Sequence, residues 1–208
     1  MKYKKSVFIF RRDFRLFDNT TLIEALENSE EVIPIFIFDE NLINPNREKF
    51  NSNVIQFMIQ SLKELDELLK EKNSKLYIFS GDEIEILNDL NINAIYENKD
   101  YSTYANKRAQ KIKEFSKENN IDYNSYEDYS INSPDRILNG SNEPYKVFTP
   151  FWKRSILETV NSPIENDYTN YFNKELSEEL GIAYLDTLKY EHNDKLILSG
   201  GRKESLAR

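Results

Sequence analysis

Short apolar runs alternate with amphipathic segments over the first 130 residues, and this alternation constrains the fold more than any other feature. The apolar runs lie at 7–10, 32–38, 75–80 and 94–97, and a weaker one lies at 122–127. The second reads VIPIFIF, which is typical of a strand buried on both faces. Strands that alternate with helices pair in parallel. The predicted fold class is therefore α/β, a doubly wound, three-layer, Rossmann-like domain with a five-stranded parallel sheet.

Segments between the apolar runs carry helix signals. Residues 54–69 repeat apolar side chains at helical spacing, which predicts a long amphipathic helix. Asn53 stands directly before this repeat and is its predicted N-cap. Thr21 and Glu24 have the spacing of a capping box, which predicts a helix after the first strand. Ser102 is the predicted cap of a further helix.

The chain is expected to fall into three parts. Residues 1–130 form the predicted α/β core. Residues 131–160 add a loop and a closing helix to the same domain, because Thr149 is a suitable N-cap and Pro150 suits the first helical position. Residues 161–208 begin with an acidic, irregular stretch that predicts a linker lying on the surface.

Composition excludes several classes of protein and site. The chain has no cysteine, so disulfides and thiolate ligands are excluded, and its one histidine, His192, rules out a His-based metal centre. It lacks an apolar run of about 18 residues and a signal-peptide core, which predicts an intracellular protein without a membrane partner. Glycine-rich dinucleotide, P-loop and nucleophile-elbow motifs are also absent.

Charge is distributed unevenly along the chain. The formal net charge is −8, yet residues 1–15 carry a balance of +5 and residues 107–117 a balance of +4. Residues 165–194 carry a balance of −6. The pattern fits either solvated faces or a basic ridge with an acidic tail.

Polar residues follow the first two strands, at the edge where open α/β sheets bind ligands. Arg11 and Arg12 form a charged loop with Asp13, and Asp39 follows the second strand. These side chains either pair with one another or form the rim of an anion or chromophore site. Trp152 is either a core residue or a platform that stacks on a base or flavin.

Several segments resemble landmarks of the DNA photolyase and cryptochrome family, in the order that the family has them. FIFRRDFRLFDNTTL, residues 8–22, resembles the opening signature, and residues 51–69 are similar to the second long helix. NKDYSTYANKRAQKI, residues 98–112, looks like the loop after the fourth strand. EPYKVFTPFWKR, residues 143–154, and SGGRKESLAR, residues 199–208, resemble later motifs.

The resemblance implies a function divided between two halves. In many members of this family the α/β half holds an antenna chromophore, and a helical half holds FAD and the lesion pocket. Residues 199–208 look like the truncated start of that helical half. The chain is thus expected to be the N-terminal half of a deoxyribodipyrimidine photolyase-like protein, which repairs UV-damaged DNA in light. It would hold no catalytic residue and no metal, and would need a separate helical, FAD-binding half as partner.

Two alternatives to this function remain open. One is a cryptochrome-like module that binds a chromophore for signalling, and the other is an inactive remnant that binds nothing. In the first reading, the helix at 148–156 and the C-terminal tail are expected to expose a face that the helical half covers.

The resemblance also suggests where an antenna would lie. Folate-binding members carry an asparagine–glutamate pair where this chain has Asn106 and Lys107, and a lysine cannot accept hydrogen bonds from folate. Residues 104–108 look more like the members that bind deazaflavin or those that bind no antenna. An antenna held by this chain is therefore expected to be a deazaflavin or flavin rather than folate. The expected cofactor-binding residues are Phe10, Arg11, Arg12, Asp39, Asn53, Gln56, Asp100, Asn106 and Arg108.

Overall fold

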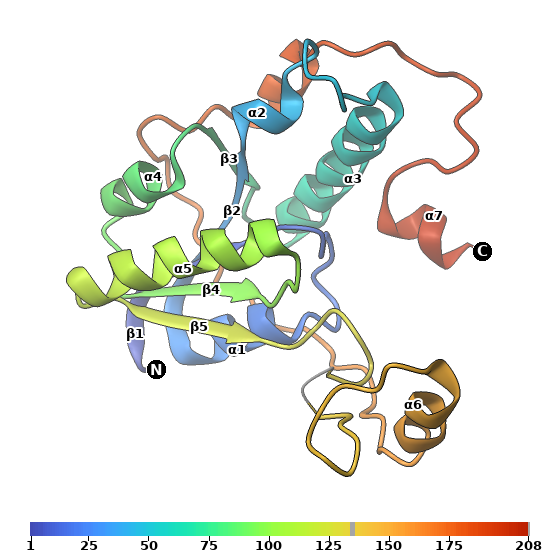
Figure 1. The fold of residues 1–208 in the computed structure, drawn as a ribbon. Coiled ribbons are helices and arrows are strands. Elements are labelled where there is room, and N and C mark those ends of the chain that lie inside the picture. Colours follow the sequence, from blue (N-terminus) through green and yellow to red (C-terminus); the bar gives the residue numbers. More distant parts are fainter. Residues whose placement is uncertain (134–135, 208) are drawn as a thin grey trace.

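The computed structural model describes residues 1–133 and 136–207 and contains a five-stranded, all-parallel sheet with the order β3-β2-β1-β4-β5 (Figure 1). Residues 134, 135 and 208, which fall in the second and third expected parts of the chain, lie outside the described residues. The strands are β1 (Tyr3–Ile9), β2 (Ser29–Phe38), β3 (Tyr77–Ser80), β4 (Ala94–Asn98) and β5 (Asp122–Tyr126). The predicted fold class is confirmed, and the strand order reverses between β1 and β4.

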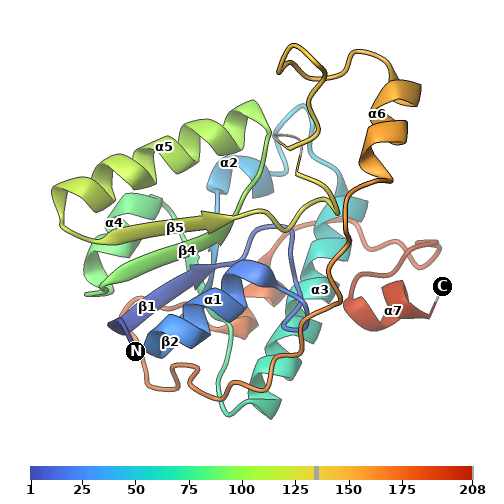
Figure 2. The same cartoon turned by 90° about the horizontal axis from the view of Figure 1, so that it is seen from below.

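Helices cover both faces of the sheet. Helices α1 (Thr20–Asn28) and α3 (Ser52–Glu71) pack on the face to which Phe8 and Phe36 point. Helices α4 (Glu83–Asp89) and α5 (Thr103–Glu118) pack on the face of Val7 and Ile35. Figure 2 shows the resulting three layers from the side of α1. The continuous apolar character of β2 follows from this arrangement, because both of its faces are buried.

Two helix starts differ from the prediction. The N-cap of α1 is Asn19, whose side chain accepts from the Leu22 N–H at 3.3 Å, so Thr21 lies inside the helix. The N-cap of α3 is Asn51, which accepts from the N–H groups of Asn53 and Val54. In each case an asparagine two residues upstream takes the capping position. Ser102 caps α5 as predicted.

Replacing the true cap of α3 is expected to destabilise the protein more than replacing the predicted one. Asn51→Ala should lower the free energy of unfolding by about 0.5–2 kcal/mol, because two helix N–H groups lose their acceptor. Asn53→Ala removes only an exposed hydrogen bond from Asn193, so its effect should be smaller. Urea unfolding measures both. Equal losses would show that the cap assignment is wrong.

The C-terminal segment is not only the surface linker that its composition predicts. The Val32 N–H donates to the Asn170 carbonyl at 3.0 Å, and the Phe172 N–H donates to the Val32 carbonyl at 2.8 Å. The segment thus pairs with the part of β2 that precedes Ile35, where the pairing with β3 begins. Tyr171 and Phe172 are buried. The prediction of a surface linker is therefore wrong for these residues, and the division at 130 and 160 stays a prediction.

The rest of this segment continues along α3. The 3-10 helix η1 (Ile182–Thr187) places Leu185 in the core on that side of the sheet. Helix α7 (Arg202–Leu206) follows a glycine pair that lies against α3. A Cβ atom at Gly200 would stand 2.0 Å from the Phe57 carbonyl oxygen, so this close approach requires glycine.

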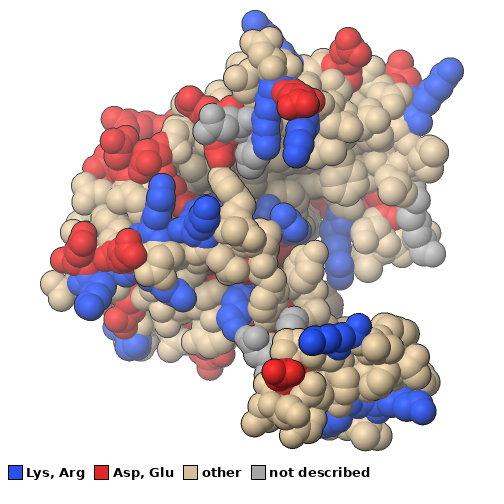
Figure 3. Space-filling view, in the orientation of Figure 1, with Lys and Arg blue, Asp and Glu red and all other residues tan. Residues whose placement is uncertain are grey.

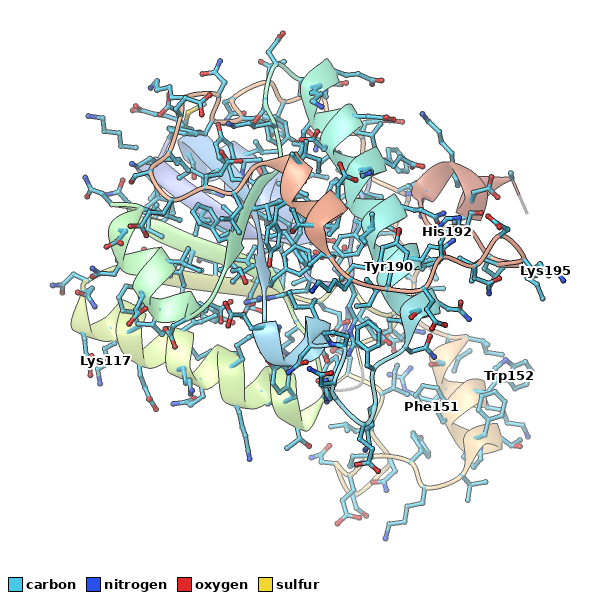
Figure 4. All side chains as sticks on the ribbon, turned by 90° about the horizontal axis from the view of Figure 1, so that it is seen from above. Lys117, Phe151, Trp152, Tyr190, His192 and Lys195 are labelled. Atoms are coloured by element: carbon cyan, nitrogen blue, oxygen red, sulfur yellow. The ribbon has the colours of Figure 1, made fainter. Side chains whose placement is uncertain are left out.

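Helix α6 (Phe148–Ser155) projects from the sheet domain on a long loop (Figures 1 and 3). It starts before the predicted cap Thr149, with Val147 at the cap position and no capping side chain. None of its residues is buried, and Trp152 is 48% exposed. Figure 4 shows Phe151 and Trp152 projecting from α6. Trp152 is thus not a core residue of the described chain.

Helix α2 (Glu40–Ile43) is the remaining short helix, in the loop after β2. Among the residues that the structure describes, no helix is both long and apolar enough to cross a membrane.

Candidate functional site at the carboxyl edge of the sheet

Arg11 lies at the switch point, directly after β1 and beside the end of β4. Its guanidinium is only 11% exposed and forms ion pairs with Glu83 and Glu97. Its Nε donates to Glu97 Oε2 at 2.9 Å, and the Tyr123 hydroxyl donates to Glu97 Oε1 at 2.8 Å. Arg11 is therefore satisfied by the protein, which makes it a buried electrostatic link between β1, β4 and α4.

Asn98, at the end of β4, holds the loop that follows β1. Its Nδ2 donates to the Asn19 side chain at 2.8 Å and also to Asp13 and Asp128. Asp128 in turn pairs with Arg15 at 2.6 Å. These bonds join three segments that are far apart in sequence and fix the shape of the charged loop. Asn98 is not among the site residues expected from the sequence, although a polar residue at a strand end is the signal that marks such positions.

The buried carboxyl of Asp13 should destabilise the folded protein less as pH falls. Burial raises the pKa of this carboxyl, although hydrogen bonds from the Arg11 N–H and Asn98 lower it. A carboxyl whose pKa is raised on folding opposes folding above that pKa, and the opposition disappears as it is protonated. Wild type should therefore gain stability relative to Asp13→Asn as pH falls from neutrality toward the unfolded carboxyl value of about 3.9. Urea unfolding across this pH range measures the difference.

Asp122→Asn serves as the control with the opposite sign. Hydrogen bonds from Tyr3 and Lys2 lower the pKa of Asp122, so its contribution to stability is lost as pH falls. Wild type should thus lose stability relative to Asp122→Asn in acid. The same pH trend in both variants would contradict the assignment for Asp13.

A cleft of about 280 Å³ opens beside this network, between α5 and the ends of β4 and β5. Three of the expected site residues, Asp100, Asn106 and Arg108, line it together with Lys99 and Lys113. Figure 3 shows basic side chains along α5, with acidic ones at its outer end and over α4. The cleft at the carboxyl edge is therefore lined by three cations and by two carboxylates, Glu97 and Asp100.

Arg12 and Asp39 lie on the exposed rim of the same edge. Arg12 is 64% exposed and its Nε lies 3.6 Å from Asp100. Asp39 accepts a hydrogen bond from the Tyr104 hydroxyl, so it links the end of β2 to α5. The Phe10 side chain, in contrast, is fully buried against Phe8 in the core and lies away from the rim.

Asn53 and Gln56 bind the C-terminal segment. The Gln56 amide exchanges two hydrogen bonds with the Asn193 backbone, at 2.8 and 3.2 Å. Asn53 accepts from the Asn193 side chain at 3.0 Å. Both side chains are thus engaged within the chain, which separates them from the cleft residues. Tyr190 and His192, labelled in Figure 4, belong to this segment beside α3.

The described residues do not provide a metal-binding cluster at this edge. Within residues 1–133 and 136–207, no three acidic or histidine side chains are grouped so that they could hold a metal ion.

Comparison with known proteins places this arrangement in a known group. The sequence model of the DNA photolyase family matches residues 6–166. The chain is 29% identical over 167 residues to a deoxyribodipyrimidine photo-lyase of Synechococcus sp., covering 76% of this chain and 33% of that protein. It is 35% identical over 91 residues to cryptochrome-1 of Aedes aegypti, covering 41% of this chain and 16% of that protein.

A solved structure resembles nearly the whole chain. It is an archaeal photolyase from Sulfolobus tokodaii with two FAD molecules, described as implying a novel light-harvesting cofactor. The TM-score is 0.83 at 33% identity, and the match covers 98% of this chain and 45% of that protein. The chain thus spans less than half the length of these relatives.

Proposed function

Because the chain belongs to the DNA photolyase family, we propose that it is the N-terminal half of a deoxyribodipyrimidine photolyase-like protein. In this proposal it acts in light-driven repair of UV-damaged DNA and requires a helical half that binds FAD. The observation that carries the proposal is the family match over residues 6–166, which includes the entire carboxyl edge of the sheet.

The role proposed for this half is to hold an antenna chromophore. The archaeal photolyase with two FAD molecules matches 98% of the chain, which supports a flavin. A deazaflavin is the other chromophore that we propose. Lys107 adjoins Asn106 in the first turns of α5 and offers only donors, which argues against folate.

The residues at the carboxyl edge differ in whether their side chains are available to a chromophore. Arg12, Asp100, Asn106 and Arg108 offer charged and polar atoms at the rim or in the cleft, so we propose that they hold it. Gln56 would have to release Asn193 before its amide could bind a ligand. Phe10 could contribute only its backbone, because its side chain is buried.

An absorption spectrum tests the antenna role. The chain should be purified in dim light, with and without incubation with FMN, FAD or a deazaflavin. A flavin or deazaflavin band that stays with the protein is expected, and Arg12→Ala should weaken it while Lys111→Ala does not. A protein-only spectrum under all of these conditions would contradict an antenna role.

The repair role needs a separate test. The chain alone should not repair an oligonucleotide that carries a thymine dimer, even with FAD and light. Repair should require an added helical half, such as that of the archaeal photolyase, because that half is proposed to bind FAD. The added half is also expected to cover apolar side chains such as Phe148, which is 73% exposed on α6. Repair by this chain with FAD alone would contradict the divided function.

A cryptochrome-like role in signalling is the second candidate. The 35% identity to a cryptochrome-1 over 91 residues favours it. A stably bound chromophore without repair in the assembled form would support this candidate over the first.

A further inference from the structure

We propose that the cleft between α5, β4 and β5 binds a phosphate group of a small molecule, with Arg108 as its main ligand. The inference deepens the proposed function and rests on it, because Arg108 is also one of the residues proposed to hold the chromophore. Phosphate binding can nevertheless be measured without a chromophore or a helical half. The inference starts from the charges that line this cleft, which are three cations and two carboxylates.

Arg108 is a cation without a carboxylate partner among the described residues. Its Nε is buried, and no hydrogen-bond acceptor within the described chain reaches it. The guanidinium stacks instead beside the Tyr104 ring, 5.7 Å from its centroid. Burial and the neighbouring Arg11 lower the pKa of Arg108, whereas Glu83 and Glu97, which pair with Arg11, raise it. An incoming anion would supply the missing acceptor.

The acidic residues that line the cleft are already engaged. Glu97 accepts from Arg11 and from Tyr123. Asp100 accepts from the Ser102 N–H at 2.8 Å and faces Arg12. Both still act on Arg108 through space, since Glu97 raises the pKa of Arg108 and Arg108 lowers the pKa of Asp100. Among the described residues, however, their hydrogen bonds and ion pairs go to other donors.

Two lysines complete the basic lining. Lys99 and Lys113 line the same cleft as Arg108. Lys113 lies over the Tyr123 ring, 5.4 Å from its centroid, so its ammonium group stands at the wall formed by β5. An arginine fork flanked by two ammonium groups suits the oxygens of a phosphate better than a neutral ligand.

The size of the cleft limits the ligand. A volume of about 280 Å³ accommodates a phosphate or diphosphate with part of its substituent. This volume lies just below the range of about 300–1,000 Å³ that is usual for small-molecule sites. The rest of a larger ligand would therefore extend toward the exposed rim at Arg12.

Isothermal titration with inorganic pyrophosphate, at low ionic strength, tests the site. Wild type should bind one equivalent, whereas Arg108→Gln should lose about tenfold or more in affinity, the equivalent of one charged hydrogen bond. Lys111→Gln is the matched control, because Lys111 is an exposed cation on the same helix that does not line the cleft. It should bind as wild type does.

Two results would overturn the proposal. One is the absence of pyrophosphate binding by wild type, which is decisive even if Arg108→Gln fails to fold. The other is an equal loss in both variants, which would indicate general attraction by the basic face of α5. A chain that binds pyrophosphate but no chromophore would retain this site and contradict only the antenna role.

Discussion

Replacing Arg11 with methionine is expected to lower the free energy of unfolding by about 3–5 kcal/mol, because two buried carboxylates lose their cation. The Glu83 and Glu97 side chains are only 14% and 4% exposed, so water cannot replace the guanidinium. Methionine fills a similar volume but offers no donor. Urea unfolding at neutral pH, monitored by far-UV circular dichroism, measures the loss.

Arg12→Met is the matched control for this experiment. Arg12 adjoins Arg11 in sequence, but it is 64% exposed and 3.6 Å from its partner Asp100. An exposed ion pair of this kind contributes about 0–1 kcal/mol. Adding Glu83→Gln and Glu97→Gln to Arg11→Met should recover part of the lost stability. Similar losses for the two arginine variants would show that the Arg11 cluster is not the electrostatic link between β1, β4 and α4.

The sheet could be predicted because its signals are local. The first four strands are each marked by an apolar run, as residues 32–38 are, and the fifth is marked more weakly by two tyrosines. Parallel pairing follows from the helices between the strands. Helix starts were less secure, since Asn51 and Asn53 are both good capping residues. The choice depends on where the loop after β2 meets α3, which the spacing of apolar residues does not specify.

The site could be predicted only in part, because its contacts join distant residues. The position of Arg11 after β1 was readable, but its partners Glu83 and Glu97 lie 72 and 86 residues away. Gln56 was expected at a chromophore, yet it binds Asn193 across 137 residues. No local pattern encodes that contact. The acidic composition of the C-terminal segment likewise gave no sign that Tyr171 and Phe172 are buried in the core.

Phe172→Ala is expected to lower the free energy of unfolding by about 3–5 kcal/mol, the usual effect of emptying the site of a buried phenylalanine. Phe172 is 5% exposed and its ring lies 5.6 Å from that of Tyr77. Phe172 and Tyr171 are the two buried aromatic side chains that anchor the segment beside Val32, so removal of the Phe172 ring should also weaken that backbone pairing. Urea unfolding measures the first effect, and hydrogen exchange of the Val32 amide measures the second.

Phe148→Ala separates burial from residue type, because it removes the same side chain from a position that is 73% exposed. Its effect on unfolding should be within about 0.5 kcal/mol of zero, and exchange at Val32 should not change. If both substitutions have equally small effects, residues around 172 form a loose surface linker, as their composition suggests. If only Phe172→Ala destabilises the protein and accelerates exchange at Val32, the segment is part of the folded α/β domain. A boundary placed before it would then cut through the core.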